Sequence, residues 1–442
     1  MRTGSVWLLA FAALALAGAP LLADPRFGRF SPASRAVLAA LAGAVLTSDA
    51  MLLWTLLGWR WNAAGVLACG AALALALRAA LPRRREEESP PRELPLAPTS
   101  LDRISVVVTI AGIAAAAVAT VAGSATSGDL VLFWGAKGQQ FALARTIDAA
   151  FLKDPCHSYL QTSYPPLLTN LYALSTLVAG RFSWGAAALT FPLGLAILAV
   201  ALPGVLSQMT SRSSALGATA LAVASISAAG AASLIAGNAE MPLLIFEAVA
   251  IGILMGPIAA SRGGALLAGL MLAGAASTKV EGLVFALAVL LVVPVIQRLP
   301  PRTLPWLAGP TALSIGLWLF FGSSRGVFEG FGAAGPLLEV SWRRTPQVLS
   351  AIGRALASTV YGLPYLLPVL ALLLSPRKSR SSLAPLLTAA CLSAGLVFSY
   401  LHGREDPSNW IRWSAARVFL PVSVLLVLGA AATGGDASDG TR

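Results

Sequence analysis

Four charged residues stand directly beside long apolar segments: Asp129, Glu240, Lys279 and Glu281. A carboxylate at the edge of a bilayer is partly desolvated, which makes it a stronger proton acceptor than it is in water. A lysine in the same setting can stabilise the charge that develops on a departing phosphate. These residue types therefore indicate group-transfer chemistry at a membrane surface.

Asp129 begins a segment in which residues 130, 133, 134 and 141 are apolar and share one face of a helix. We expect this helix to lie along the membrane surface. Asp129 then has two competing roles: it caps the helix by accepting its first free amide protons, or it acts as a general base. Its position alone favours the cap.

Lys279 and Glu281 lie in the turn between two short apolar segments. Charges in such a hairpin are costly unless they are paired or functional. A structural Lys279–Glu281 pair and a lysine that faces a substrate phosphate fit this pattern equally well, so both interpretations stay open.

The last long polar segment runs from His402 to Trp413 and contains many hydrogen-bonding groups. Trp410 suits stacking on a sugar, although tryptophan at this depth is more often an interfacial anchor. The only two histidines, His157 and His402, lie far apart in the sequence and give little support for a metal site. No cofactor is therefore assigned, and a divalent cation stays open.

Three arginines occur in or just after this segment: Arg404, Arg412 and Arg417. The planar guanidinium is well shaped to bind phosphate oxygens. For any one of these arginines taken alone, snorkelling of the side chain to the membrane surface is the better explanation.

The elements that must position these groups are membrane-spanning helices. The 442-residue chain is 57% hydrophobic and only 11% charged, whereas soluble domains carry about 25% charged residues. Apolar runs long enough to cross about 30 Å of hydrocarbon recur throughout, and their Gly- and Ala-rich composition favours helices over barrel strands. The sequence thus predicts an all-α polytopic membrane protein. Its first apolar stretch is long for a signal peptide and is interpreted as a retained span.

We expect about 13 transmembrane helices. They lie near residues 5–23, 37–57, 62–82, 104–126, 185–206, 214–236, 241–259, 263–278, 282–297, 304–322, 355–374, 383–401 and 417–433. Residues 83–103 contain runs of Arg and Glu and several prolines, which cannot build a core and indicate a cytoplasmic linker. The chain then divides into three N-terminal spans (1–82), this linker, a catalytic transmembrane domain (104–433) and a disordered tail (434–442).

The segment from Tyr164 to Gly180 decides the predicted topology. If it crosses the bilayer, the later basic loops lie outside; if it lies along the surface, they lie inside with the earlier ones, as the positive-inside rule requires. We therefore expect an interfacial segment, and the candidate residues above then share the outer face. The net charge of +12 belongs to these short inner loops and does not indicate binding to nucleic acid.

Several short motifs occur in the order and on the face found in the C-type glycosyltransferase superfamily (GT-C), which this chain resembles. The motifs are Asp129 with the aromatic–lysine segment ending at Lys137, Tyr-Pro-Pro-Leu from Tyr164, Asn-Ala-Glu-Met-Pro-Leu around Glu240, and Thr-Lys-Val-Glu-Gly around Lys279 and Glu281. The resemblance covers residues 104–295. Family members are membrane enzymes that use polyprenyl-phosphate-linked sugars, and the chain looks similar to the mannosyltransferase and aminoarabinose transferase group.

The resemblance implies that Asp129 activates the acceptor hydroxyl and that Glu240 is a second catalytic acid. Asp129 stands alone here, where several family members have two adjacent acids. Contacts with the substrate or the donor phosphate are expected from the remaining candidates: Lys137, Tyr164, Lys279, Glu281, His402, Arg404, Trp410, Arg412 and Arg417.

The expected donor is a polyprenyl-phosphate-linked sugar, and the expected acceptor is a lipid, a glycan or a protein. We expect an inverting transfer on the periplasmic or exoplasmic face of a bacterial inner membrane. The main alternative is a transporter or flippase of lipid-linked sugars. Transporters typically show internal repeats and charges near the bilayer midplane, whereas the charges here gather on one predicted face.

Overall fold

The computed structural model describes residues 3–82, 98–123, 127–230, 236–328, 341–357, 363–374, 380–402 and 406–433, and within these ranges every regular element is helical. Helices satisfy their backbone amides locally, as a bilayer requires. Six of the described helical segments are long and apolar enough to cross a membrane: Pro32–Leu56, Ala63–Ala80, Ser100–Gly123, Pro301–Ser324, Arg380–Leu401 and Ser414–Thr433. The protein is therefore an all-α membrane protein, as its composition predicts.

The first part of the chain forms α1 (Thr3–Leu22), α2 (Pro32–Leu56), α3 (Ala63–Ala80), α4 (Ser100–Gly123), α5 (Gly135–Ala144), α6 (Ala149–Lys153), α7 (Leu167–Ala179), α8 (Trp184–Ala188), α9 (Thr190–Leu206) and α10 (Arg212–Gly230). The second part forms α11 (Glu240–Met255), α12 (Arg262–Thr278), α13 (Val280–Ile296), α14 (Leu304–Ser324), α15 (Thr345–Ala357), α16 (Leu363–Leu374), α17 (Arg380–His402), α18 (Pro407–Val418) and α19 (Leu420–Thr433). Each segment expected to span the bilayer overlaps at least one of these helices, while the number that cross stays a prediction.

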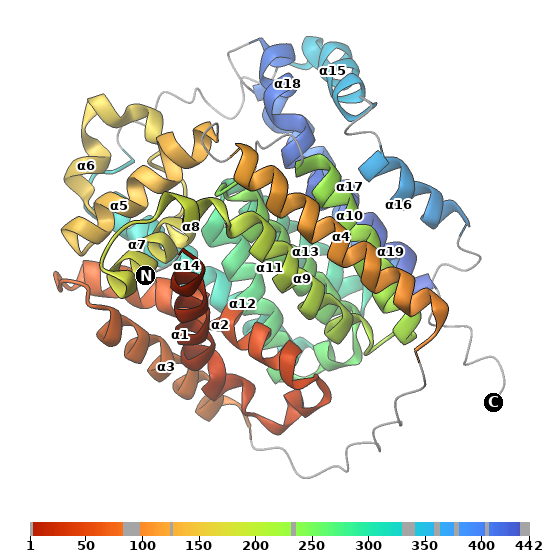
Figure 1. Cartoon of the computed structure of the whole chain (residues 1–442), viewed down its shortest axis with the longest axis horizontal. Coiled ribbons are helices and arrows are strands. Elements are labelled where there is room, and N and C mark those ends of the chain that lie inside the picture. Colours follow the sequence, from red (N-terminus) through yellow and green to blue (C-terminus); the bar gives the residue numbers. More distant parts are fainter. Residues whose placement is uncertain are drawn as a thin grey trace.

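Helix α11 lies in the middle of the molecule, with α1 and α3 on one side and α16 and α19 on the other (Figure 1). Every residue of α11 is buried, and the helix packs against α9, α12 and α19. A polar side chain on such a helix must find its partners inside the protein. This enclosure is what holds Glu240, the first residue of α11, in a fixed place.

The N-terminal helices α1 and α2 touch through their backbones. A Cβ atom added at Gly18 would lie 2.0 Å from the carbonyl oxygen of Ala39, and one added at Gly43 would lie 1.9 Å from that of Leu14. Small residues allow this close packing in membranes. Because α2 also contacts α9, α12 and α14, the N-terminal helices share one hydrophobic core with the later ones.

Helix α7 contains most of the segment expected to lie along the membrane surface. Its 13 residues extend about 20 Å, which is short for a hydrocarbon layer of about 30 Å. The first half of α7 is buried on all sides against α5 and the N-terminal helices, and no residue of α7 is exposed. Asn170 donates a 3.0 Å hydrogen bond to Ser48 Oγ, and the Tyr172 hydroxyl donates one of 2.7 Å to the carbonyl of Gly237. The helix is therefore enclosed by protein.

Candidate active site

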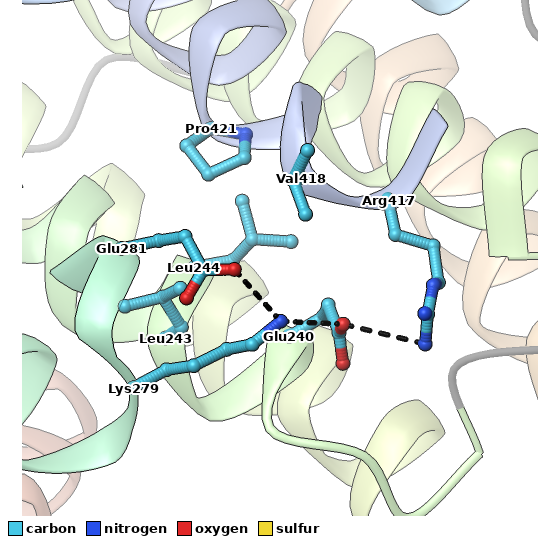
Figure 2. A pocket seen from close by; sticks show the side chains of 8 residues that line it. All are labelled: Glu240, Leu243, Leu244, Lys279, Glu281, Arg417, Val418 and Pro421. Atoms are coloured by element: carbon cyan, nitrogen blue, oxygen red, sulfur yellow. Dashed lines mark hydrogen bonds and ion pairs between the residues drawn. The ribbon is translucent and has the colours of Figure 1, made fainter. Parts of the chain in front are cut away.

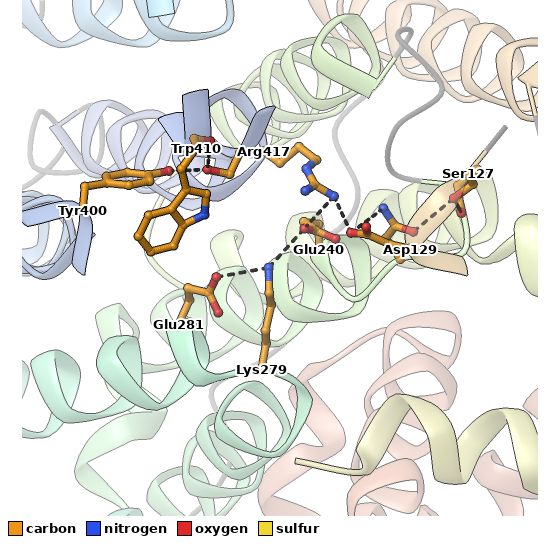
Figure 3. Close-up of polar contacts among 11 residues, drawn as sticks. Ser127, Asp129, Glu240, Lys279, Glu281, Tyr400, Trp410 and Arg417 are labelled. Atoms are coloured by element: carbon orange, nitrogen blue, oxygen red, sulfur yellow. Dashed lines mark hydrogen bonds and ion pairs between the residues drawn. The ribbon is translucent and has the colours of Figure 1, made fainter. Parts of the chain in front are cut away.

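Five charged side chains from separate parts of the chain form one continuous set of ion pairs (Figure 3). Arg417 Nη1 lies 2.6 Å from Asp129 Oδ2 and 3.4 Å from Glu240 Oε1. Lys279 Nζ donates a 3.2 Å hydrogen bond to Glu240 Oε1 and lies 3.1 Å from Glu281 Oε1. We call these five residues the ionic network.

Helix ends position three members of the network. Glu240 occupies the first turn of α11 and Glu281 the first turn of α13, where the helix dipole favours negative charge. Lys279 separates α12 from α13 and has extended backbone angles (φ −159°, ψ 159°). The turn is tight, because a Cβ atom at Gly282 would lie 2.0 Å from the carbonyl oxygen of Ala275.

Asp129 is not a helix cap. It precedes a π-helical turn, Leu130–Trp134, but its side chain makes no capping hydrogen bond to that turn. Its carboxylate instead accepts a hydrogen bond from Arg417, in the last turn of α18, and lies 3.5 Å from Asn238 Nδ2. Ser127 Oγ lies 3.1 Å from Asn238 Oδ1 and supports that contact. The carboxylate thus faces the network.

The network also constrains the threading. Asp129 and Glu240 both contact Arg417, so they lie at the same end of the helix bundle. Between them the chain passes through α7, α9 and α10 as its longer helices. If α9 and α10 both cross the bilayer, the chain returns to its starting face, whereas a crossing by α7 as well would put Glu240 on the opposite face. An α7 that does not cross is compatible with these contacts under that condition, and the threading stays a prediction.

Lys279 is held in its charged form. Its side chain is 10% exposed, and burial alone would lower the pKa of the amine. The adjacent carboxylates of Glu240 and Glu281 outweigh burial and raise that pKa above its usual range. Within the described residues, Glu240 Oε2, Glu281 Oε2 and Arg417 Nε are buried without a hydrogen-bond partner. Unsatisfied buried polar atoms of this kind mark a place where a further group can bind.

Four members of the network, Asp129, Lys279, Glu281 and Arg417, line a cavity of about 230 Å³. The other polar residues of its lining are Gln161, Tyr164, Ser399, Tyr400 and Ser414. Pockets for drug-sized ligands occupy about 300–1,000 Å³, so this space suits one small polar group such as a single sugar. A second cavity of about 10 Å³ adjoins Glu240 and has apolar walls that include Leu243 and Pro421 (Figure 2). It has room for about one water molecule.

Aromatic side chains form part of the wall. The rings of Tyr400 and Trp410 meet edge to face with centroids 4.9 Å apart, and Trp410 is 39% exposed. The Tyr400 hydroxyl lies 2.7 Å from Ser414 Oγ (Figure 3). On Tyr164, burial raises the pKa of the phenol to about 12, so its hydroxyl stays neutral. A neutral aromatic surface with adjacent hydroxyls is suited to contact a sugar.

The structure brings together most of the candidate residues: Asp129, Tyr164, Glu240, Lys279, Glu281, Trp410 and Arg417. Lys137 lies outside the cavity lining, where its Nζ donates a 3.3 Å hydrogen bond to the Gln161 carbonyl. Arg412 is exposed on α18 and is likewise not part of the cavity lining in the described residues. The side chain of His402, and the whole of Arg404, lie outside the described residues.

Four polar lining residues were not predicted from the sequence: Gln161, Ser399, Tyr400 and Ser414. Ser399 and Tyr400 belong to α17, which was predicted to span the membrane, and Ser414 belongs to α18. Their residue types carried no distinctive signal, because a tyrosine at the end of an apolar run is ordinarily an interfacial anchor.

Metal ligands are not gathered at the site. Among the described residues, no group of three or more His, Cys, Asp or Glu side chains is placed to hold a metal ion. The carboxylates of the network are separated by the two cations that they contact. A divalent cation therefore has no assigned position.

Comparison with known proteins adds no assignment. No family model, no curated protein and no solved structure matches the chain. Function must therefore be argued from the chemistry of the site itself.

Proposed function

We propose that the protein is a membrane glycosyltransferase that moves a sugar from a polyprenyl-phosphate donor to an acceptor hydroxyl. The observation that carries this proposal is the ionic network itself, in which Asp129, Lys279, Glu281 and Arg417 line one cavity and Glu240 joins the two cations from beside it. Buried ion pairs contribute little net stability compared with apolar packing of similar volume. A network of this extent is therefore better explained by chemistry than by the need to fold.

In the proposed reaction, the acceptor oxygen attacks the anomeric carbon of the sugar while the bond from that carbon to the donor phosphate oxygen breaks. Asp129 takes the proton of the acceptor hydroxyl. The polyprenyl phosphate leaves with the bonding electrons, and a single displacement of this kind inverts the anomeric centre. Lys279 and Arg417, the cations in the cavity lining, stabilise the phosphate charge.

The remaining residues position these groups. Glu240 contacts both cations, at 3.2 Å and 3.4 Å, and so fixes the distance between them. Trp410 and Tyr400 offer their rings to the sugar. Holding the sugar in this cavity, with the donor phosphate and the acceptor at its edges, replaces a bimolecular encounter by an oriented one.

The proposed architecture is GT-C-like, with about 13 crossing helices and the site on the periplasmic or exoplasmic face of a bacterial inner membrane. It is supported by the basic loops, and the contacts of the network are compatible with it. The exposed native Cys156 should react with a membrane-impermeant thiol reagent on intact cells. A cysteine at the exposed Ser211, in a Cys156→Ser background, should react only after the membrane is opened. The reverse labelling pattern would place the site on the cytoplasmic face of the membrane.

The function is tested by mass spectrometry of envelope lipids, glycans and proteins with and without the chain, followed by transfer assays in liposomes with radiolabelled polyprenyl-phosphate sugars. We expect one sugar modification to disappear without the chain and free polyprenyl phosphate to form with it. A flippase would move the intact donor between leaflets and release no polyprenyl phosphate. That result would favour the alternative function, a transporter of lipid-linked sugars, over the transferase.

A further inference from the structure

Asp129 depends on one cation, whereas Glu240 has two. In the described part of the chain, the only positively charged partner of Asp129 is Arg417, at 2.6 Å. Glu240 contacts Arg417 at 3.4 Å and also Lys279 at 3.2 Å. If Arg417 moves away, Glu240 keeps a cation and Asp129 does not.

This pairing opposes the role of Asp129 as a base. A carboxylate oxygen that already accepts a hydrogen bond from a guanidinium is not available to the acceptor hydroxyl. Asp129 Oδ2 carries the short contact to Arg417 and also faces Asn238 Nδ2 at 3.5 Å. In the empty site the base is therefore occupied.

Arg417 is placed to exchange partners. It lines the 230 Å³ cavity, its side chain is 19% exposed, and its Nε is buried without a hydrogen-bond partner. A phosphate in the cavity offers oxygens that match the guanidinium fork, and the Nε donor is free to take part. Lys279 also contacts two carboxylates, at 3.2 Å and 3.1 Å, but both contacts use its only side-chain nitrogen. Arg417 makes its two contacts through Nη1 and keeps Nε without a partner.

We propose that Arg417 acts as a latch on Asp129, which the donor phosphate releases by drawing the guanidinium onto itself. The latch rests on the proposed function, since it requires a phosphate-bearing lipid in the cavity. It makes binding ordered: the acceptor hydroxyl meets a competent base only after the donor is in place. By reciprocity, a carboxylate and a phosphate that compete for one arginine must weaken each other's hold on it.

The test measures binding rather than transfer. Purified protein in detergent is titrated with a polyprenyl phosphate and, separately, with the corresponding polyprenol. Asp129→Asn removes the competing charge and should bind the phosphate lipid more tightly than wild type, within the range of about 5- to 150-fold that is typical of coupled sites. Binding of the polyprenol should not change. Asp154→Asn, which removes an acid whose side chain is 45% exposed and lies outside the cavity lining, should bind like wild type.

A double-mutant cycle separates the latch from general electrostatics. In an Arg417→Gln background, which should bind the phosphate lipid less tightly, Asp129→Asn should have no further effect. Equal affinity of wild type and Asp129→Asn, or the same tightening in the Arg417→Gln background, would overturn the latch. Asp129→Ser provides the same loss of charge if the asparagine variant does not fold. If wild type does not prefer the phosphate lipid over the polyprenol, the proposed function fails, and the latch with it.

Discussion

Two buried lysines in the described structure differ in what surrounds them. Lys137 is 3% exposed and Lys279 is 8% exposed. Each lies near one ring of a stacked aromatic pair: Lys137 Nζ is 4.7 Å from the centre of Trp134, and Lys279 Nζ is 6.0 Å from the centre of Tyr164. Lys279 also contacts two carboxylates, whereas Lys137 donates a hydrogen bond to the carbonyl of Gln161.

The neighbours decide the charge. Desolvation without a carboxylate partner lowers the pKa of Lys137 to about 7. At Lys279, Glu240 and Glu281 outweigh the same desolvation and raise the pKa above its ordinary value. Only Lys279 therefore provides a permanent positive charge for a phosphate, although the two lysines are buried to a similar extent.

The largest effect is expected from removing the proposed base, Asp129, which belongs to the same ionic network as Lys279. Asp129→Asn keeps the size of the side chain but cannot take a proton. We expect sugar transfer in membranes to fall by about 10²–10⁴-fold, with normal insertion and expression. Asp154→Asn is the matched control and should keep wild-type transfer. Full activity in Asp129→Asn would locate the chemistry at another acid, of which Glu240 is the next candidate.

The second prediction exchanges the two lysines for methionine. Lys279→Met should reduce the rate of transfer by about 10²–10³-fold, because a fixed donor to developing charge is lost. At pH 8, Lys137→Met should cost less than about tenfold, since it removes an amine that is mostly neutral. Lys279→Arg keeps the charge and should retain more activity than Lys279→Met. This variant is the control for leaving the carboxylates of Glu240 and Glu281 without the cation of residue 279. Equal losses in the two methionine variants would refute the comparison.

The sequence predicted the position of the helices and the end of the bundle at which the charges gather, because both follow from apolar runs and basic loops. It also placed Lys137 in an aromatic–lysine segment whose apolar residues 130, 133, 134 and 141 share one helical face. It did not predict whether an acid lay opposite. The presence of an acid beside a lysine depends on how the helices are rotated against each other. The contact between Arg417 and Asp129 depends on the same rotation, because the two residues are 288 positions apart in the sequence.

The third prediction concerns stability and pH. A lysine usually has a pKa of 10.5, whereas that of Lys137 in the folded protein is about 7. Between these values the unfolded chain binds a proton that the folded protein does not, so Lys137 makes stability rise with pH. The slope from one such group is at most about 1.4 kcal/mol per pH unit. Thermal unfolding in detergent from pH 7 to 10 should show a flatter profile for Lys137→Met than for wild type.

Lys279→Met is the contrasting variant in this experiment. In the wild-type protein, Lys279 is charged in both the folded and the unfolded state below pH 10.5. Removing it should therefore lower overall stability but leave the slope of stability against pH unchanged. A Lys137→Met protein with the wild-type slope would mean that Lys137 is charged when folded, and the two lysines would then be alike.

The smallest effect is expected at Tyr164, whose ring contacts both Trp134 and Lys279. Tyr164→Phe keeps the ring and should change transfer by less than about threefold, because the stacking and cation–π contacts remain. Tyr164→Leu removes both contacts, each of which is worth about 0.5–2 kcal/mol, and should lower transfer by roughly three- to tenfold with a lower unfolding temperature.

Because Tyr164 contacts Lys279 directly, Tyr164→Leu should be non-additive with Lys279→Met and additive with Lys137→Met when transfer is measured in the double mutants. Non-additivity with both would show that the aromatic pair couples the lysines, and a loss in Tyr164→Phe equal to that in Tyr164→Leu would assign the effect to the hydroxyl rather than to the ring.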